Sequence, residues 1–214
     1  MSTADGEHEA HPDAAPDVAL SDRAKRALAI QELLIEKGIV SREDVQDGIG
    51  LMRNRSPADG ATVVARAWVD PDFKTRLLAD AHSAVAELGY SLTHDTDLQV
   101  VENTEEVHHL VVCTLCSCYP GSLLGPPPDW YKSLAYRQRA VIEPRSVMRE
   151  FGLELDEGVQ VKVVDSTADT RYLVLPLRPP GTDGMTEEQL AELVTRDSMV
   201  GVSDPRSPSA APVS

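Results

Sequence analysis

All three cysteines of this 214-residue chain lie within six consecutive positions. The segment reads Cys113-Thr114-Leu115-Cys116-Ser117-Cys118, and we call it the cysteine loop. An apolar run, Leu110-Val111-Val112, precedes it, and Tyr119-Pro120-Gly121 follows as a turn. Three thiolates this close repel one another unless they share a cation, and a bound metal lowers the pKa of a thiol until its proton leaves. The cysteine loop therefore predicts a metal site.

Three other interpretations of the cysteine loop remain open. A structural zinc site usually has four ligands in two separated pairs, so His108 or His109 would have to act as the fourth ligand. A thioredoxin-like redox pair of Cys113 and Cys116 would leave Cys118 unused, and we recognise no βαβ pattern around it. The third interpretation is three inert buried cysteines, which requires tight clustering without any chemical reason.

The spacing itself favours a different metal geometry. With one residue between Cys116 and Cys118, both sulfurs and the backbone nitrogens of Ser117 and Cys118 can lie in one plane around a metal. Cys113 can then reach an axial position, which leaves one position open. Deprotonated amides are very strong donors, so this ligand set favours trivalent cobalt or iron. An open position on such an ion acts as a Lewis acid.

The composition excludes several classes of function. The chain has 35 acidic and 20 basic residues, a net charge of −15 and a pI near 4.7. That balance argues against binding to nucleic acid or to an anionic membrane. No apolar run approaches the roughly 20 residues that span a bilayer. Because the N-terminus lacks the cationic and apolar regions of a signal peptide, we expect a cytoplasmic protein.

The sequence predicts an α+β fold, with a helical N-terminal arm followed by a layered α/β domain that has antiparallel strands. Hydrophobic periodicity and turn signals divide the chain into four parts. These are a disordered acidic tail (1–18), the helical arm (19–89), the metal-binding α+β domain (90–202) and a flexible C-terminal tail (203–214).

Within the arm, the strongest helix pattern starts at Asp70-Pro71 and continues to Leu88. In the α+β domain, residues 98–102 and 107–112 read as two strands joined by a hairpin. Two further strands are predicted near residues 159–163 and 172–175. A helical segment from Trp130 to Phe151, broken at Glu143-Pro144, lies between the two pairs.

Several motifs together resemble one enzyme family. The segment Val111 to Pro120 looks like the metal-binding motif of the nitrile hydratase alpha subunit, cobalt type. The resemblance extends over about residues 57–202 and includes these segments: Val101-Glu102-Asn103-Thr104, Pro127-Pro128-Asp129-Trp130-Tyr131-Lys132, Tyr136-Arg137, Glu143-Pro144-Arg145, Val174-Leu175-Pro176, Arg178-Pro179, Gly181-Thr182-Asp183-Gly184 and Leu193-Val194-Thr195-Arg196.

The resemblance implies hydration of a nitrile to an amide at a non-corrin Co(III) centre, with Fe(III) as the less favoured metal. Carried onto matching positions, Cys113 is the axial thiolate, and Ser117 and Cys118 supply amide nitrogens. Cys116 becomes a sulfinic acid and Cys118 a sulfenic acid. In this family, threonine at the second motif position accompanies cobalt, so Thr114 indicates cobalt. Cys118, Cys116 and Ser117 are thus the expected catalytic residues, and Cys113, Cys116, Ser117 and Cys118 the expected metal ligands.

The resemblance also implies partners. A beta subunit, which may itself be split, completes a heterodimer or heterotetramer and contributes two arginines to the oxidised sulfurs. A metallochaperone or activator is expected to load the metal.

This sequence departs from the family pattern at two places. The family usually has Tyr-Pro-Trp-Pro after the metal motif, whereas Gly121-Ser122 follows Tyr119-Pro120 here. The loss of an indole favours a bulky or heteroaromatic nitrile; the alternative is that the beta subunit fills the gap. Upstream, His94 and Thr96 stand where the family often carries Gln and Glu, so no site role is assigned to them. Three alternatives stay open: a thiocyanate hydrolase-type metal subunit, a non-catalytic metal-binding module, and a redox sensor.

Overall fold

The structure, a computed structural model, describes residues 20–92 and 97–208. The chain divides into two compact units, Met1–Gly48 and Ile49–Ser214. The sequence predicted four parts, with the helical arm ending at residue 89. This division into four parts stays a prediction. The predicted tail at 1–18 lies outside the described residues, as do His94, Thr96 and the last six residues of the C-terminal tail.

The first unit contains α1 (Asp22–Glu36) and the start of α2 (Arg42–Asn54), which continues across the boundary. The hydroxyl of Ser21 caps α1 by accepting a hydrogen bond from the Ala24 N–H. An ion pair between Arg42 and Glu32, at 2.6 Å, links the two helices. Considering the described residues alone, no residue of α1 is buried. No helix among the described residues is long and apolar enough to cross a membrane.

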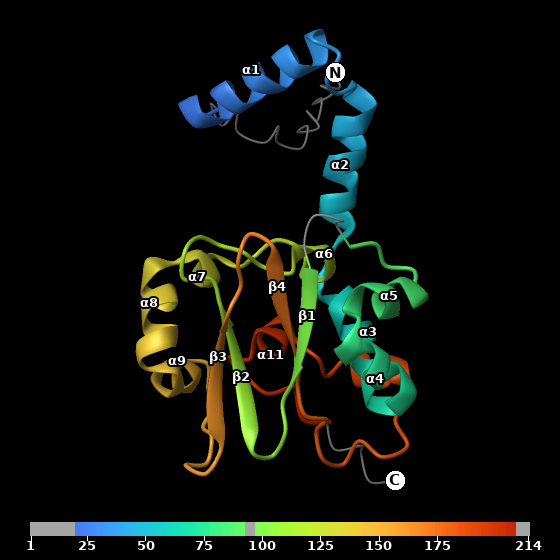
Figure 1. The fold of residues 1–214 in the computed structure, drawn as a ribbon, viewed down its shortest axis with the longest axis vertical. Coiled ribbons are helices and arrows are strands. Elements are labelled where there is room, and N and C mark those ends of the chain that lie inside the picture. Colours follow the sequence, from blue (N-terminus) through green and yellow to red (C-terminus); the bar gives the residue numbers. More distant parts are fainter. Residues whose placement is uncertain (1–19, 93–96, 209–214) are drawn as a thin grey trace, which may run out of the picture. The chain divides into compact units, whose positions relative to one another are not determined.

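The second unit is built on four strands with helices around them. The strands are β1 (Asp97–Glu102), β2 (Val107–Val112), β3 (Gln160–Asp165) and β4 (Thr170–Leu175). The helices of this unit are α3 (Pro57–Val69), α4 (Pro71–Ala79), α5 (Ala81–Glu87), α6 (Gly121–Leu124), α7 (Asp129–Lys132), α8 (Leu134–Ile142), α9 (Pro144–Glu150), α10 (Glu187–Ala191) and α11 (Arg196–Val200). Figure 1 shows the strands in the order β3, β2, β4, β1, with α8 and α9 beside β2 and β3, and α4 and α5 beside β1.

The predicted antiparallel arrangement is wrong. β1 pairs with β4 and β2 pairs with β3, and both pairs are parallel. The segment between β1 and β2 is therefore not a hairpin connection, because β4 lies between these two strands (Figure 1). Asn103 directs the chain away from β1: its backbone N–H extends the pairing to β4 by donating to Leu175, while its side-chain oxygen accepts from the His109 N–H.

The parallel pairing corrects a second expectation. Parallel neighbours need a long crossover between them, and the chain from β2 to β3 runs through α6, α7, α8 and α9. The cysteine loop thus begins a βαβ-type crossover, which the sequence did not reveal. The strand positions themselves were predicted closely, because continuous apolar runs mark buried strands whichever way they pair.

One predicted helix is divided in two. The pattern from Asp70 to Leu88 forms α4 and α5, with the break at Asp80. The Asp80 carboxylate accepts hydrogen bonds from both the backbone N–H and the hydroxyl of Ser83, so it begins a new helix. Aspartate competes with the helical backbone in this way and is favoured at N-caps.

The core of the second unit rigidly supports the end of β2. Leu110, Val111, Val112 and Cys113 are all 0% exposed. On one side α3 packs closely, since a Cβ at Gly60 would lie 2.5 Å from Leu124 and 2.8 Å from Met199. The first cysteine is therefore fixed by the core, and the loop emerges from it.

Candidate metal centre

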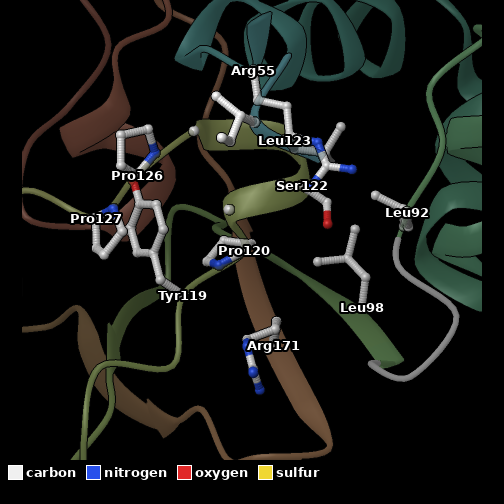
Figure 2. A pocket seen from close by; sticks show the side chains of 13 residues that line it. Arg55, Leu92, Leu98, Tyr119, Pro120, Ser122, Leu123, Pro126, Pro127 and Arg171 are labelled. Carbon is white, nitrogen blue, oxygen red and sulfur yellow. The ribbon is translucent and has the colours of Figure 1, made fainter. Parts of the chain in front are cut away.

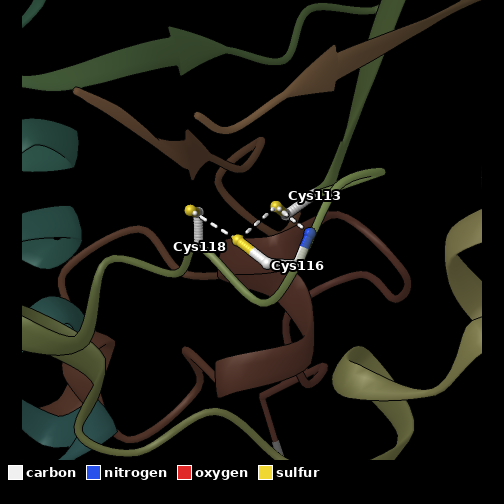
Figure 3. A group of neighbouring side chains, drawn as sticks. All are labelled: Cys113, Cys116 and Cys118. Atoms are coloured by element: carbon white, nitrogen blue, oxygen red, sulfur yellow. Dashed lines mark hydrogen bonds between the residues drawn. The ribbon is translucent and has the colours of Figure 1, made fainter. Parts of the chain in front are cut away.

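The cysteine loop leaves β2 in a conformation that belongs to no helix or strand. Cys113 is buried, Cys118 is half-buried and Cys116 is exposed. The Cys116 sulfur lies 3.5 Å from that of Cys113 and 3.2 Å from that of Cys118 (Figure 3). The three sulfur atoms all lie within 4.8 Å of one another. The fold therefore brings together the three side chains that the sequence singled out.

Two tyrosines hold the ends of the loop. The Tyr136 hydroxyl donates to the carbonyl of Val111 at 2.6 Å, just before the first cysteine. The Tyr131 hydroxyl donates to the carbonyl of Cys118 at 2.8 Å, at the last one. Tyr131 is completely buried, and both rings belong to an aromatic cluster with Trp130. These contacts fix the backbone at both ends independently of any ligand.

Asp165 holds the second residue of the loop. Its carboxylate accepts a hydrogen bond from the Thr114 backbone N–H at 2.9 Å and another from the Thr114 hydroxyl at 2.5 Å. The β2–β3 register places Asp165 opposite Val112, one residue before the first cysteine. The parallel pairing thus delivers a carboxylate to the start of the loop.

The electrostatics of the loop separate the two later thiols. Hydrogen bonding, first from the Cys118 thiol and then from the Ser117 N–H, lowers the pKa of Cys116 to about 7. Burial raises the pKa of Cys118 to about 12, and its hydrogen bond with Cys116 adds to the effect. Cys116 is therefore the first of this pair to ionise. A cation bound among the sulfurs reverses the effect of burial, because it stabilises every thiolate.

The donor set fits a thiophilic transition metal. Three convergent sulfurs are soft ligands, and the two amide nitrogens of Ser117 and Cys118 belong to the same exposed loop. Within the part of the chain that the structure describes, no histidine or carboxylate joins the three cysteines as a fourth close ligand. The four-ligand zinc interpretation therefore lacks its histidine.

The two candidate histidines have other partners. His108 is buried: its Nε2 lies 2.9 Å from the Gly201 carbonyl, and its Nδ1 lies 3.1 Å from the Asn103 amide nitrogen. Nε2 must donate to the carbonyl, and Nδ1 must accept from the amide, so the ring is neutral. Burial lowers the pKa of His108, in agreement with this tautomer. His109 Nδ1 lies 3.2 Å from the side-chain oxygen of Asn103.

Sequence reasoning did not find three residues that position the loop: Asp165, Tyr131 and Tyr136. Both tyrosines lie in motifs that carried the family resemblance, and those motifs were the sequence signal that could have identified them. Asp165 ends a predicted strand, but its contact with Thr114 depends on the parallel β2–β3 register. An antiparallel reading of the strands could not bring the two residues together.

Comparisons with known proteins agree on one family. A family model described as nitrile hydratase, alpha chain, matches residues 21–203. The low-molecular weight cobalt-containing nitrile hydratase subunit alpha of Rhodococcus rhodochrous is 52% identical over 189 residues, which are 88% of this chain and 91% of the relative.

Solved structures show the same likeness. A chain of recombinant thiocyanate hydrolase with partially modified cobalt centres has a TM-score of 0.82 at 42% identity, covering 91% of this chain and 96% of that one. A double mutant of the Fe-type nitrile hydratase from Comamonas testosteroni Ni1 has a TM-score of 0.78 at 43% identity, covering 89% and 93%.

Proposed function

Because this chain belongs to the nitrile hydratase alpha-chain family, we propose that it is the metal-bearing subunit of an enzyme that hydrates a nitrile to the amide. The family places it among the hydro-lyases. The observation that carries the proposal is the convergence of the Cys113, Cys116 and Cys118 sulfurs within 4.8 Å. The convergence occurs on a loop whose backbone is held on both sides by the fold.

We assign the metal ligands to the sulfurs of Cys113, Cys116 and Cys118 and to the backbone nitrogens of Ser117 and Cys118. Cobalt is favoured over iron for two reasons. The Rhodococcus rhodochrous relative is named as cobalt-containing, and threonine stands at position 114. Dioxygen is the oxidant that would convert Cys116 to the sulfinic acid and Cys118 to the sulfenic acid.

A trivalent ion held by these donors would supply Lewis acidity toward the nitrile. The protein's own contribution is to place an oxygen base beside the nitrile carbon. We assign this role to the sulfenate oxygen of Cys118, which takes a proton from the attacking water. That proton then passes to the nitrile nitrogen, and tautomerisation gives the amide. Cys116 and Ser117 directly precede Cys118, and as ligands of the same metal they would hold Cys118 in a fixed orientation.

The loop is incompletely covered within this chain, which supports a partner subunit. Leu115 is 88% exposed, although it lies between two site residues, and Cys116 beside it is exposed. Oxidised sulfurs carry negative charge, which needs cationic hydrogen-bond donors once the site is closed. We propose that a beta subunit, in one or more chains, supplies them, and that a metallochaperone or activator loads the metal.

The test is amide formation by the full chain coexpressed with its beta partner in cobalt-supplemented medium. We expect acetamide from acetonitrile, and we expect Cys118→Ser to abolish turnover while the two subunits still copurify. The control variant Asp169→Ala changes an exposed residue outside the loop and should retain full turnover. No amide from any nitrile, with complete assembly and bound metal, would contradict the proposal. Thiocyanate hydrolysis without nitrile hydration would favour the related thiocyanate hydrolase activity, which the 0.82 TM-score keeps as the second candidate.

A further inference from the structure

A cavity of about 570 Å³ begins directly after the cysteine loop. Its wall includes Tyr119, Pro120, Gly121 and Ser122, the four residues that follow Cys118. Figure 2 shows Leu92 and Leu98 on another side of it, and the rest of the wall is largely apolar. Ligand sites in proteins typically enclose about 300–1,000 Å³. The space is thus far larger than a two-carbon nitrile requires.

Gly121 leaves part of this space open. A Cβ built at Gly121 meets no atom within 4 Å, and its φ lies outside the left-handed range that favours glycine. Neither the backbone nor the packing therefore demands glycine here. Gly125, on the same wall, is different: its φ is +68°, and a Cβ there would lie 2.6 Å from the carbonyl oxygen of Arg55. Because Gly121 lines the cavity and has open space around its Cβ position, a larger residue there has room to extend into the cavity.

Among the residues that the structure describes, the charged residues of the cavity wall are two arginines, and no described carboxylate lines it. Arg171 is engaged, because its guanidinium donates to the carbonyls of Thr167 and Thr170. The guanidinium of Arg55 differs, since no described residue accepts a hydrogen bond from it or pairs with it. In Figure 2 it extends over Ser122 at the edge of the cavity. A half-buried arginine with no carboxylate partner in the described part of the chain has donors to offer a ligand.

We propose that this cavity binds the ring of a heteroaromatic nitrile, with Gly121 providing the room and Arg55 donating a hydrogen bond to a ring nitrogen. The inference rests on the proposed function, which assigns the nitrile group to the cysteine loop; the cavity wall begins at Tyr119, the residue after Cys118. The apolar wall accepts the faces of the ring. A site that offers a hydrogen-bond donor discriminates against a ligand that lacks the matching acceptor.

The experiment compares acetonitrile, benzonitrile and 3-cyanopyridine as substrates of the assembled enzyme. Gly121→Trp should lower kcat/KM for both ring substrates at least about tenfold more than for acetonitrile, because the indole fills the ring site. Gly158→Trp is the matched control, since Gly158 also has open space around its Cβ but is exposed and lies outside the cavity.

Arg55→Met tests the hydrogen bond separately from the volume. It should lower kcat/KM for 3-cyanopyridine about tenfold while changing that for benzonitrile much less, since a hydrogen bond to a charged group is worth about one such factor or more. Arg23→Met, an exposed change in the first unit, is its control. A readout that does not depend on the metal is the binding of 3-methylpyridine to the metal-free complex, measured by saturation-transfer NMR. Both cavity variants, Gly121→Trp and Arg55→Met, should weaken this binding.

The outcomes separate the two proposals. A wild-type enzyme that hydrates acetonitrile but neither ring substrate overturns the inference and leaves the proposed function intact. Equal loss on all three nitriles in Gly121→Trp also overturns it, provided that the smaller Gly121→Leu shows the same pattern in a folded complex. Absence of hydration with every nitrile counts against the proposed function, and the NMR binding then still decides whether the cavity accepts the ring.

Discussion

Asp165 contributes to the site through two hydrogen bonds to one residue, Thr114. We predict that Asp165→Ala lets the assembled enzyme lose cobalt at least about tenfold faster during dialysis against a chelator, because partners of a ligand-bearing loop typically change metal affinity 10–100-fold. Both residues are exposed, so the free energy of unfolding should fall by only about 1 kcal/mol. Asp169→Ala is the control, and equal cobalt loss in the two variants would contradict this role.

His108 gives a prediction for pH. Burial holds its pKa below the ordinary value of 6.5, so the unfolded chain binds the proton first as the pH falls below 6.5. The free energy of unfolding should therefore decrease with acidification below that value, by up to about 1.4 kcal/mol per pH unit for one proton. Above pH 6.5 this residue contributes no pH dependence.

The measurement is urea unfolding of wild type and His108→Gln between pH 5 and 7.5. The variant is expected to be less stable throughout but to show a shallower slope below pH 6.5. Burial also lowers the pKa of half-buried His109, and the charge of His108 adds to that effect, so a His109→Gln variant is measured alongside to separate the two. Identical slopes would show that His108 does not carry the acid sensitivity.

At the residue scale, the convergence of the three cysteine side chains could be predicted from the sequence, because six positions limit their separation in any fold. The residues that hold the loop could not. Tyr131 and Asp165 act on it from elements far along the chain, and hydrogen bonds of this kind depend on tertiary contacts. Local periodicity carries no information about them.

At the scale of elements, one glycine joins the C-terminal helix to the strand that carries the site. Gly201 ends α11 with φ +87°, and its carbonyl accepts the hydrogen bond from His108. A Cβ at this position would lie 1.9 Å from the carbonyl oxygen of His109 on β2. The close approach of α11 to β2 therefore requires glycine.

We predict that Gly201→Ala lowers the free energy of unfolding by about 3 kcal/mol or more, because a left-handed backbone and a collision with a buried strand add together. The matched control is Gly152→Ala, where φ is +85° but no atom lies within 4 Å of the added Cβ. That change should cost about 1–2 kcal/mol from the backbone alone. Chemical denaturation of both variants measures the difference, and equal costs would show that α11 can move away from β2.

Element positions were predictable where an apolar run or a cap marks them, as at residues 107–112. Strand partners were not. A four-residue connection between two apolar runs favours a hairpin, but here β4 lies between the runs and pairs with the first. Alternation within a strand does not identify its neighbour. The parallel order became visible only from contacts between segments that are distant in the sequence.

At the scale of the whole molecule, the core of the second unit holds the start of the cysteine loop, while the middle of the loop is exposed. Cys113 is buried, whereas Leu115 and Cys116 are exposed. In the first unit, Leu28, Ile30 and Leu33 of α1 are also exposed. Nitrile hydratase is a heteromer of alpha and beta subunits, so activity and metal content should be measured on the assembly.

The most direct test of the account is elemental analysis of the full chain purified with its beta partner from cobalt-supplemented cells. We predict close to one cobalt per chain in the wild-type complex and loss of that cobalt in a Cys113→Ser variant that still assembles. One iron per chain would keep the metal-bearing role and contradict the choice of cobalt. Zinc alone, or no metal in a correctly assembled complex, would contradict the central claim that the cysteine loop holds a catalytic metal.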